Sequence, residues 1–436
     1  MVEHIEFDVT ELKEIWELLS AQERLDGFRM LDAEEQEEFF VDLPARDEYE
    51  LLMTLPIAER RLWFRLLAPD DAADVIQEAD EDERLALLAL LDEPTRREVS
   101  ALLAYEEDDA GGLMSSRFAR VRPEMTVDEA ISYLRKQALS HVPVETIYYV
   151  YVLAHDQTLL GVVSFRELFS EPGSRLIRAV MRTDVVTVSA ELDQEAVAKV
   201  MADNDVLAVP VCDEDNRMIG IVTVDDIVDV VQEEATEDVQ KYAAMEALEE
   251  PYLRTSFFDL MKKRAGWLSL LLFGEMLTAT AMGYFEGDLR NFTFLATFIP
   301  LIISSGGNSG SQASTLVIRA LTLGEIRLRD WWRVMRRELA AGVTLGGILG
   351  TIGLLRVILW AQLFPQVYEP VAMGFTVFFS LIGVVLFGTL AGSMLPLLLR
   401  RFRLDPATAS APMVATLVDV MGLIIYFTVA SLLVVR

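Results

Sequence analysis

GIVTVDDIVDVV, residues 220–231, is the stretch that decides the fold of the soluble half. It reads as an apolar strand led by Gly220, and the pair Thr223 and Asp226 then has the spacing that caps the start of a helix. The same pattern occurs in LGVVSFRELF, residues 160–169, where Ser164 and Glu167 take the capping positions. An amphipathic helix and a hydrophobic strand precede each copy. Residues 118–179 and 180–235 are therefore predicted to be two β-α-β repeats.

The residues on either side of these repeats have a different character. In residues 1–117, pairs of leucines at helical spacing alternate with acidic turns, as in ADEDERLALLALLDEPTRREVSALL (79–103). This recurrence predicts a stacked helical superhelix. Residues 236–264 are predicted to form a helical connector that leads into the apolar part of the chain, residues 265–436.

The C-terminal part contains five apolar runs of the roughly 20 residues that a membrane-crossing helix needs. They lie near residues 265–285, 292–318, 338–360, 370–399 and 409–435. Lysine and arginine gather before the first run and in the loops at 319–337 and 400–403. The positive-inside rule then places the N-terminal half in the cytosol and the C-terminus outside. The first residues lack the features of a signal peptide, so we expect a multi-pass protein of the cytoplasmic membrane.

Charge divides the chain in the same way. Residues 1–260 contain 60 acidic and 23 basic residues, a net charge of −37, whereas residues 261–436 carry a net charge of +6. Acids crowded this densely oppose folding unless counter-ions relieve their repulsion. They also repel phosphates, which argues against nucleic acid as a partner. Cys212 is the only cysteine, which excludes an intrachain disulfide and fits a reducing cytosol. We infer that a cation crosses the membrane through one half and is sensed by the other.

Asp419 is the only ionisable residue in the fifth apolar run, roughly 15 Å from its cytosolic end. A carboxylate at that depth costs on the order of 3 kcal/mol, so we expect water or a cation as its partner. The alternative is a purely structural role, in which a protonated Asp419 forms a hydrogen bond to a neighbouring helix. Glu275, in the first run, either faces a pore or bonds a neighbouring helix, and we favour the second interpretation.

The second run, FIPLIISSGGNSGSQASTLVIR (298–319), is rich in small and polar residues. These residues are typical of close helix packing, and beside Asp419 they also suit one wall of a hydrated pathway. Oxygen donors with a single carboxylate favour a hard divalent cation that keeps its water, as Mg²⁺ does. The three histidines all lie outside the apolar runs, which disfavours zinc or copper.

Four features of the sequence occur together: GGNSGSQ (306–312), LDP (404–406), MVATLVDVMG (413–422) and the two repeats, which are similar to a pair of CBS domains. In this combination the chain resembles the MgtE family of magnesium channels. The resemblance implies a homodimer with a pore between the subunits, in which Asp419 holds hydrated Mg²⁺ and Ala415 lies one turn before it. Gly307 and Asn308 match the family pattern, whereas Ser311 stands where the family often has Asn.

The resemblance also implies regulatory Mg²⁺ bound between acidic cytosolic domains, which closes the pore through the connector as a plug helix. The matching acids are Asp193, Glu195, Asp205, Asp226, Asp229, Glu234, Glu237 and Asp238, with Asp70, Asp74 and Glu38 on the helical domain. Like charges repel when Mg²⁺ is scarce, and bridging cations draw them together when it is plentiful. For a single exposed acid, an ordinary solvated surface charge remains the alternative. Tyr149 and Arg166 match positions implicated in ATP binding, although Val206 replaces an expected aromatic residue.

Three other functions are alternatives to a Mg²⁺-gated Mg²⁺ channel. A proton-coupled or broader divalent-cation transporter would use Asp419 as its coupling carboxylate. An intramembrane metalloprotease is contradicted by the missing HExxH motif. A membrane-anchored sensor without conduction does not need five spans rich in small residues. The phosphate-binding motif GxxxxGK[ST] is absent, so an ATP-driven pump is not expected. We expect a transport protein and not an enzyme.

Overall fold

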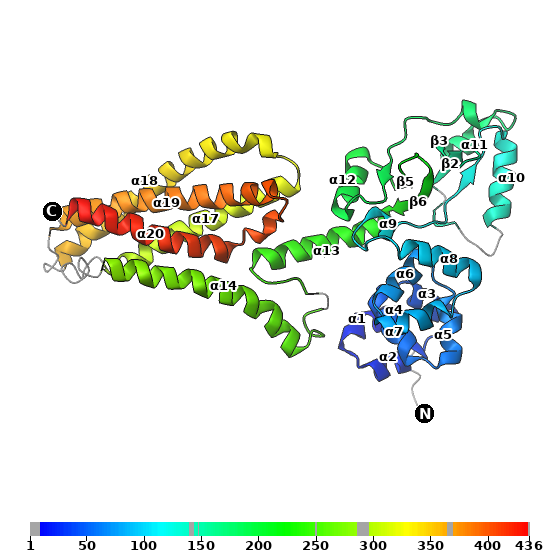
Figure 1. Cartoon of the computed structure of the whole chain (residues 1–436), viewed down its shortest axis with the longest axis horizontal. Helices are drawn as coiled ribbons and strands as arrows, with labels where there is room; N and C mark the ends of the chain where they lie inside the picture. The colour runs from blue at the N-terminus through cyan, green and yellow to red at the C-terminus, as the bar shows by residue number, and fades with distance from the viewer. Residues whose placement is uncertain are drawn as a thin grey trace. The chain divides into compact units, whose positions relative to one another are not determined.

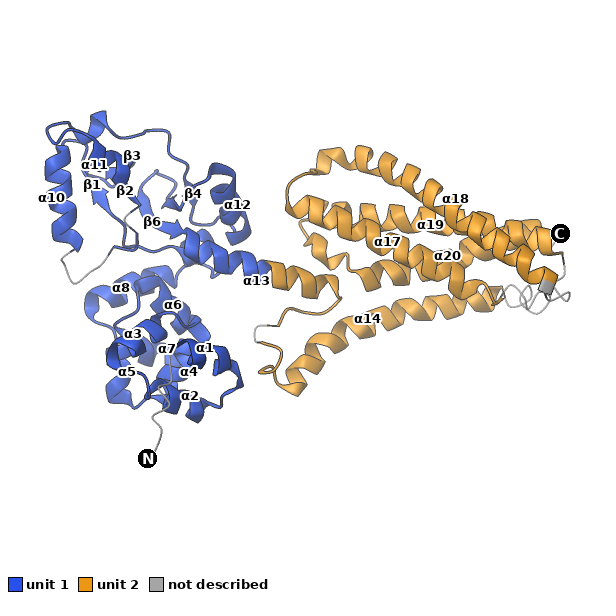
Figure 2. Cartoon of the chain, turned by 180° about the vertical axis from the view of Figure 1, so that it is seen from behind, with its two compact units in different colours: residues 1–234 blue, residues 235–436 orange. Residues whose placement is uncertain are grey.

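The computed structural model describes residues 9–138, 144–146, 148–248, 251–285, 296–363 and 369–434. The chain divides into two compact units, residues 1–234 and 235–436 (Figure 2). The first unit holds the helical domain and both β-α-β repeats, and the second holds the long apolar helices.

Short helices build the N-terminal part of the first unit, as the leucine pattern predicts (Figure 1). Acidic turns start several of them: Ser20 and Asp32 cap two helices, and each forms a reciprocal capping box with an acid three residues later. Apolar side chains such as Phe39 and Leu52 point inward and are fully buried. The helices are Val9–Ile15 (α1), Ala21–Phe28 (α2), Ala33–Val41 (α3), Ala45–Thr54 (α4), Ile57–Phe64 (α5), Pro69–Gln77 (α6), Glu81–Leu88 (α7), Glu93–Leu102 (α8) and Ala110–Leu113 (α9).

Two small mixed sheets follow, one for each predicted repeat. In each, a two-residue strand pairs in parallel with the second strand, which pairs antiparallel with the third. The strands are Arg120–Val121 (β1), Tyr149–Leu153 (β2) and Leu159–Ser164 (β3), then Val188–Ser189 (β4), Ala208–Cys212 (β5) and Met218–Thr223 (β6). The helices are Val127–Ala138 (α10) and Phe165–Ser170 (α11) in the first repeat, and Gln194–Asn204 (α12) and Val224–Tyr242 (α13) in the second.

Both predicted capping pairs are confirmed. The Ser164 hydroxyl and Glu167 form a capping box at the start of α11. The Thr223 hydroxyl donates to Asp226 Oδ2 over 2.6 Å at the start of α13. The capping pair therefore fixes where the Asp226 carboxylate lies.

The helical domain and the second repeat share one hydrophobic core. Val209, Val222 and Ile227 of the repeat belong to the same buried cluster as Phe39 and Leu52 of the helical domain. This shared core holds α6 and the start of α13 within one compact body, which brings the acids of the two elements together.

The second unit contains the long helices. Four of the helices described are long and apolar enough to cross a membrane: Phe257–Tyr284, Leu328–Gln362, Pro370–Arg401 and Ala411–Leu433. They correspond to α14 (Phe257–Tyr284), α18 (Trp331–Leu363), α19 (Pro370–Arg401) and α20 (Ala411–Leu433).

The second apolar run is helical as well, as α17 (Ile299–Thr322). The start that we predicted for this span, residues 292–295, lies outside the described residues. Its glycine, serine and asparagine residues keep it out of the four helices above, which were selected by hydropathy, and many of these residues are buried. At Gly388 and Gly392 of α19, an added Cβ would stand 2.3 Å from the Gly306 carbonyl oxygen and 2.0 Å from that of Gly310. The backbones of α17 and α19 are therefore in direct contact.

The residues predicted as the connector, 236–264, contain the end of α13, a break and the start of α14. Ala244 adopts a left-handed conformation with φ of 57°, and α14 begins at Phe257, after the Ser256 cap. Helix α13 itself is continuous from Val224 to Tyr242, so it runs from the second repeat into the second unit.

Candidate functional site

Asp419 lies half-buried near the middle of α20, eight residues after its start. Helix α14 packs against α20 close to this residue: a Cβ added to Gly274 would stand 2.6 Å from Thr416 Cγ2, three residues before Asp419. Glu275, the residue after Gly274, therefore lies on a neighbouring helix close to the predicted ion-binding residue. Two neighbouring carboxyl groups withdrawn from bulk water favour a shared proton or a cation between them.

The small residues of α17 and α20 meet close to Asp419. A Cβ added to Gly307 would stand 3.7 Å from Ala415 Cβ, one turn before Asp419. Asn308 is exposed on α17 and Ser311 is half-buried. The structure thus places Gly307 against Ala415, and the Asn308 side chain is exposed on the surface of α17.

The last turn of α13 is fastened to the membrane helices of the same unit. The Tyr242 hydroxyl donates to the Ser311 carbonyl oxygen over 3.0 Å and also contacts the Thr315 hydroxyl. Lys241 Nζ lies 2.8 Å from Asp405, in the loop between α19 and α20, and 2.7 Å from Glu237. These hydrogen bonds raise the pKa of Lys241 although burial acts against them. We call Lys241 and Tyr242 with their partners the α13 latch.

A second acidic centre lies in the first unit, where α6 of the helical domain faces the start of α13. Asp70 is only 7% exposed, and its Oδ1 has no hydrogen-bond partner among the described residues. Asp71, Asp74 and Asp226 are half-buried. Asp226 contributes to raising the pKa of all three α6 acids. We call Asp70, Asp71, Asp74 and Asp226, together with Glu48 of α4, the interface acids.

Burial is the largest cause of the raised pKa of every interface acid, and neighbouring carboxylates add to it. The pKa of Asp71 and that of Asp226 are raised to about 6, and the pKa of Glu48 is raised to about 10. The pKa values of Asp70 and Asp74 are raised well above the usual range. In the part of the chain that is described, no three acids, histidines or cysteines converge closely enough to hold a metal ion. Because their pKa values are raised, the interface acids bind protons more readily in the folded protein, and this protonation relieves their mutual repulsion when no cation is bound.

The pH dependence of stability follows from these shifts. An acid whose folded pKa is raised stabilises the fold below its unfolded pKa of about 4, and that stability is lost as the pH rises through the folded pKa. We expect the melting temperature of the Mg²⁺-free protein to fall between about pH 4 and 6 because of Asp71 and Asp226, and to fall further towards pH 10 because of Glu48. For a domain of this size, each 1 kcal/mol lost lowers the melting temperature by about 2–4 °C.

Thermal unfolding of the full chain with a metal chelator, against pH, measures this effect. Added Mg²⁺ should flatten the curve, because a cation replaces the protons. A melting temperature that rises throughout this pH range would contradict the assignment.

The other predicted regulatory acids lie in several places. Asp193 caps α12 and accepts hydrogen bonds from the backbone N–H groups of Glu195 and Ala196, and Asp205 ends that helix in a left-handed conformation. Glu234 accepts a hydrogen bond from Gln194 over 2.7 Å. Asp229 is exposed on α13, and Glu38 is exposed on α3.

Glu237 and Asp238 lie on the part of α13 that belongs to the second unit. Glu237 pairs with Lys241. Burial, and then the nearby Asp405, raise the pKa of Asp238.

Glu48, Asp71 and Glu145 take part in the interface but were missed from the sequence. A signal existed for Glu48, because it is three residues before Leu51 and four before Leu52 and so lies on the buried face of α4. Glu145 raises the pKa of Asp70, yet nothing in the sequence distinguishes it from other acids.

The two residues implicated in nucleotide binding come from one repeat. Tyr149 begins β2 and pairs in register with Ser164, and Arg166 lies two residues later in α11. Tyr149 is half-buried and Arg166 is exposed.

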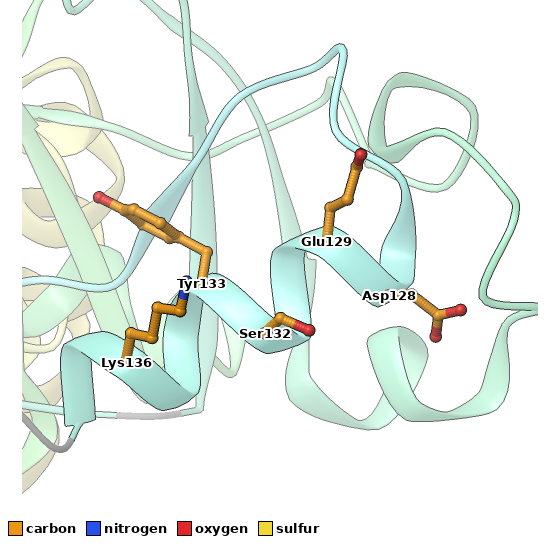
Figure 3. A pocket seen from close by; sticks show the side chains of 5 residues that line it. All are labelled: Asp128, Glu129, Ser132, Tyr133 and Lys136. Atoms are coloured by element: carbon orange, nitrogen blue, oxygen red, sulfur yellow. The ribbon is translucent and has the colours of Figure 1, made fainter.

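A separate shallow pocket of about 350 Å³ opens on α10 (Figure 3). Its lining consists of Asp128, Glu129, Ser132, Tyr133 and Lys136. All five belong to one helix and none is a predicted site residue, so we assign it no role.

Comparison with known proteins gives matches along most of the chain. The MgtE family, described as a divalent cation transporter, matches residues 299–429. The MgtE intracellular N domain matches residues 7–108, and the CBS domain matches residues 110–173 and 177–233. The magnesium transporter MgtE of Thermus thermophilus is 42% identical over 368 residues, which cover 84% of this chain and 79% of that protein.

Two further matches extend this comparison. The magnesium transporter MgtE of Bacillus subtilis is 33% identical over 362 residues, which cover 83% of this chain and 78% of that protein. A solved cytosolic domain of the Mg²⁺ channel MgtE in complex with ATP aligns with a TM-score of 0.48 and 39% identity. The alignment covers 52% of this chain and 91% of that one.

Proposed function

Because the chain belongs to the MgtE family of magnesium transporters, we propose that it is a Mg²⁺-selective channel that cytosolic Mg²⁺ closes. The observation that carries this proposal is the Asp419 carboxyl, held within a membrane helix beside the contact of Gly307 with Ala415. The N domain is cytosolic, in keeping with the family. With the basic loops on the cytosolic side, α20 ends outside the cell.

The ion path is proposed to follow α17 and α20, at the interface of two copies of the chain. Mg²⁺ gives up its water reluctantly and is held through few protein carboxylates. Asp419 supplies one, and small residues such as Gly307 and Ala415 leave room for the water shell. The Asn308 amide and the carbonyl oxygen of Ser311 are neutral oxygen donors farther along the path.

Sensing is proposed to take place at the interface acids. When cytosolic Mg²⁺ is scarce, ionised Asp71, Asp74 and Asp226 repel one another, and the helical domain separates from the second repeat. When Mg²⁺ is plentiful, hydrated cations bridge the acids through their water shells, since the acids that the structure describes do not converge closely enough to bind a metal ion directly, and they hold the two together. Coupling of this kind between two sites is typically worth about 1–3 kcal/mol. The acids on α12 and the later acids on α13 are proposed to bind further regulatory Mg²⁺.

Helix α13 is suited to carry the signal, because it holds Asp226 at its first turn and Tyr242 at its last. The α13 latch ties its end to α17 and to the loop before α20. We propose that this contact belongs to the closed channel and that withdrawal of α13 opens it.

Replacing Tyr242 with Phe tests the latch. The change removes one hydrogen bond, whose net value is about 1 kcal/mol, so the closed state should weaken by about fivefold. We expect residual Mg²⁺ flux at saturating cytosolic Mg²⁺ to rise by that factor in proteoliposomes. Tyr252→Phe, in the exposed segment after α13, is the matched control and should behave as wild type. Equal residual flux in Tyr242→Phe and wild type would argue against the latch.

A broader or proton-coupled divalent-cation transporter is the alternative function. It predicts uptake driven by a pH gradient without a Mg²⁺ gradient, and similar rates for Mn²⁺, Co²⁺ and Ni²⁺. Ion flux in proteoliposomes with the pH gradient and the metal varied independently separates it from a channel. A channel should carry Mg²⁺ down its electrochemical gradient whatever the pH gradient.

An ATP site at the CBS pair is also proposed, from the positions of Tyr149 and Arg166. The Tyr149 ring could stack on adenine and the Arg166 guanidinium could pair with phosphate. Calorimetric titration with ATP, for the wild type and for Arg166→Ala, tests it.

A further inference from the structure

Glu275 is an acid in a membrane helix that the proposed mechanism does not yet use. The half-buried stripe of α14, at Leu271, Gly274, Thr278 and Ala281, is the face that packs against other helices. At Gly274 an added Cβ would stand 2.6 Å from Thr416 Cγ2 of α20. Glu275 follows Gly274 directly, and Asp419 is three residues after Thr416, so both acids lie within one helical turn of this contact.

The two acids also lie at the same depth. Helices α14 and α20 run side by side in the same direction, as both views show (Figures 1 and 2). Glu275 is eleven residues after Arg264 of the basic cluster, which corresponds to about 16 Å along the helix. Asp419 is about 12 Å from the start of α20, which follows the basic loop at 400–403.

The Glu275 carboxylate needs a polar partner at its position in the membrane. Its side chain is exposed in the single chain, within a span whose most apolar window is not buried at all. A carboxylate that faces lipid at this depth costs on the order of 3 kcal/mol by insertion scales. One turn further, Thr278 Oγ1 is shielded from solvent but has no hydrogen-bond partner among the described residues. Water on this side of Asp419 would supply hydrogen-bond partners to both the Glu275 carboxylate and the Thr278 hydroxyl.

We propose that Glu275 is a second carboxylate of the ion site and a determinant of its preference for divalent cations. This inference rests on the proposed channel function. With Glu275, each of the two copies that line the path contributes a charge of −2 instead of −1, and the added attraction is twice as large for Mg²⁺ as for Na⁺ because it scales with the charge of the ion. Asp419 without Glu275 would discriminate less strongly between divalent and monovalent cations. Glu275 therefore sets how tightly Mg²⁺ binds in the pore and how well monovalent ions are excluded.

Glu275→Gln keeps the shape of the side chain and removes the charge. In proteoliposomes we expect the half-saturating Mg²⁺ concentration to rise about fivefold to tenfold, the gain of a charged over a neutral hydrogen bond. Maximal Mg²⁺ flux should change by a smaller factor than the half-saturating concentration does. The ratio of Mg²⁺ to Na⁺ permeability should fall. Glu338→Gln, on α18, is the control and should leave both quantities unchanged.

Glu275→Asp and Glu275→Asn separate charge from packing, because both shorten the side chain equally. Recovery of the permeability ratio by Asp but not by Asn supports the inference, even if Gln impairs folding. Equal behaviour of Asp and Asn overturns it. If Glu275→Gln matches wild type while Asp419→Asn loses transport, the inference fails and the channel function stands. If neither variant alters transport, the channel function fails as well.

Discussion

Asp419→Asn should reduce selective Mg²⁺ flux by about 100-fold or more. Hydrogen bonds to a charged group contribute about 1.5–3 kcal/mol each, and the loss of 2.7 kcal/mol corresponds to that factor. Asn keeps the size of the side chain and leaves the contact of Gly307 with Ala415 in place. The effect should therefore come from charge and not from a collapsed pathway. Mg²⁺-sensitive dye trapped in proteoliposomes measures the flux.

Two controls accompany this measurement. The melting temperature of the variant should equal or exceed that of wild type, because the change removes a carboxylate from the membrane interior. Glu338→Gln should conduct as wild type does. Selective Mg²⁺ flux within a factor of two of wild type in Asp419→Asn would exclude this residue as the ion site.

Neutralising the interface acids should remove the response to cytosolic Mg²⁺. In Asp71→Asn/Asp226→Asn neither repulsion nor bridging remains, so we expect flux to become independent of Mg²⁺ between micromolar and millimolar concentrations. Wild type should gain stability from Mg²⁺, by about 2.7 kcal/mol at 100 times its dissociation constant. The double variant should gain little and should be more stable than wild type without Mg²⁺, since both acids have a pKa raised to about 6.

Glu37→Gln, an exposed acid on α3, is the control for lost charge alone. It should keep both the inhibition by Mg²⁺ and the stabilisation by Mg²⁺. Inhibition of the double variant at the wild-type Mg²⁺ concentration would show that sensing takes place elsewhere, for example at the acids on α12.

The sequence was sufficient where local chemistry decides the structure. The pairs Ser164–Glu167 and Thr223–Asp226 predict the helix starts because capping needs only four neighbouring residues. Asp419 is conspicuous because an acid within an apolar run has few explanations. The order of helical domain, paired repeats and long apolar helices follows from hydrophobic periodicity alone.

The interface acids were harder to find because the property that sets them apart is tertiary. In a half with 60 acids, Asp71 resembles its neighbours until folding brings it beside Asp226 and withdraws it from water. The same holds for Glu275, because Asp419 is 144 positions away in the chain and is brought near only by the packing of α14 against α20. Periodicity predicts which face of a helix is buried, but not which helix will cover it.

The glycine contacts between α17 and α19 limit how such a pathway can change its width. With the carbonyl oxygens of Gly306 and Gly310 pressed against Gly388 and Gly392, the two helices cannot slide or roll against each other without a steric clash. We expect them to move as one rigid body, a fixed wall of the conduit. Any hinge must then lie in the elements that surround this pair, and α14, the least enclosed of the long helices, has the most freedom to swing.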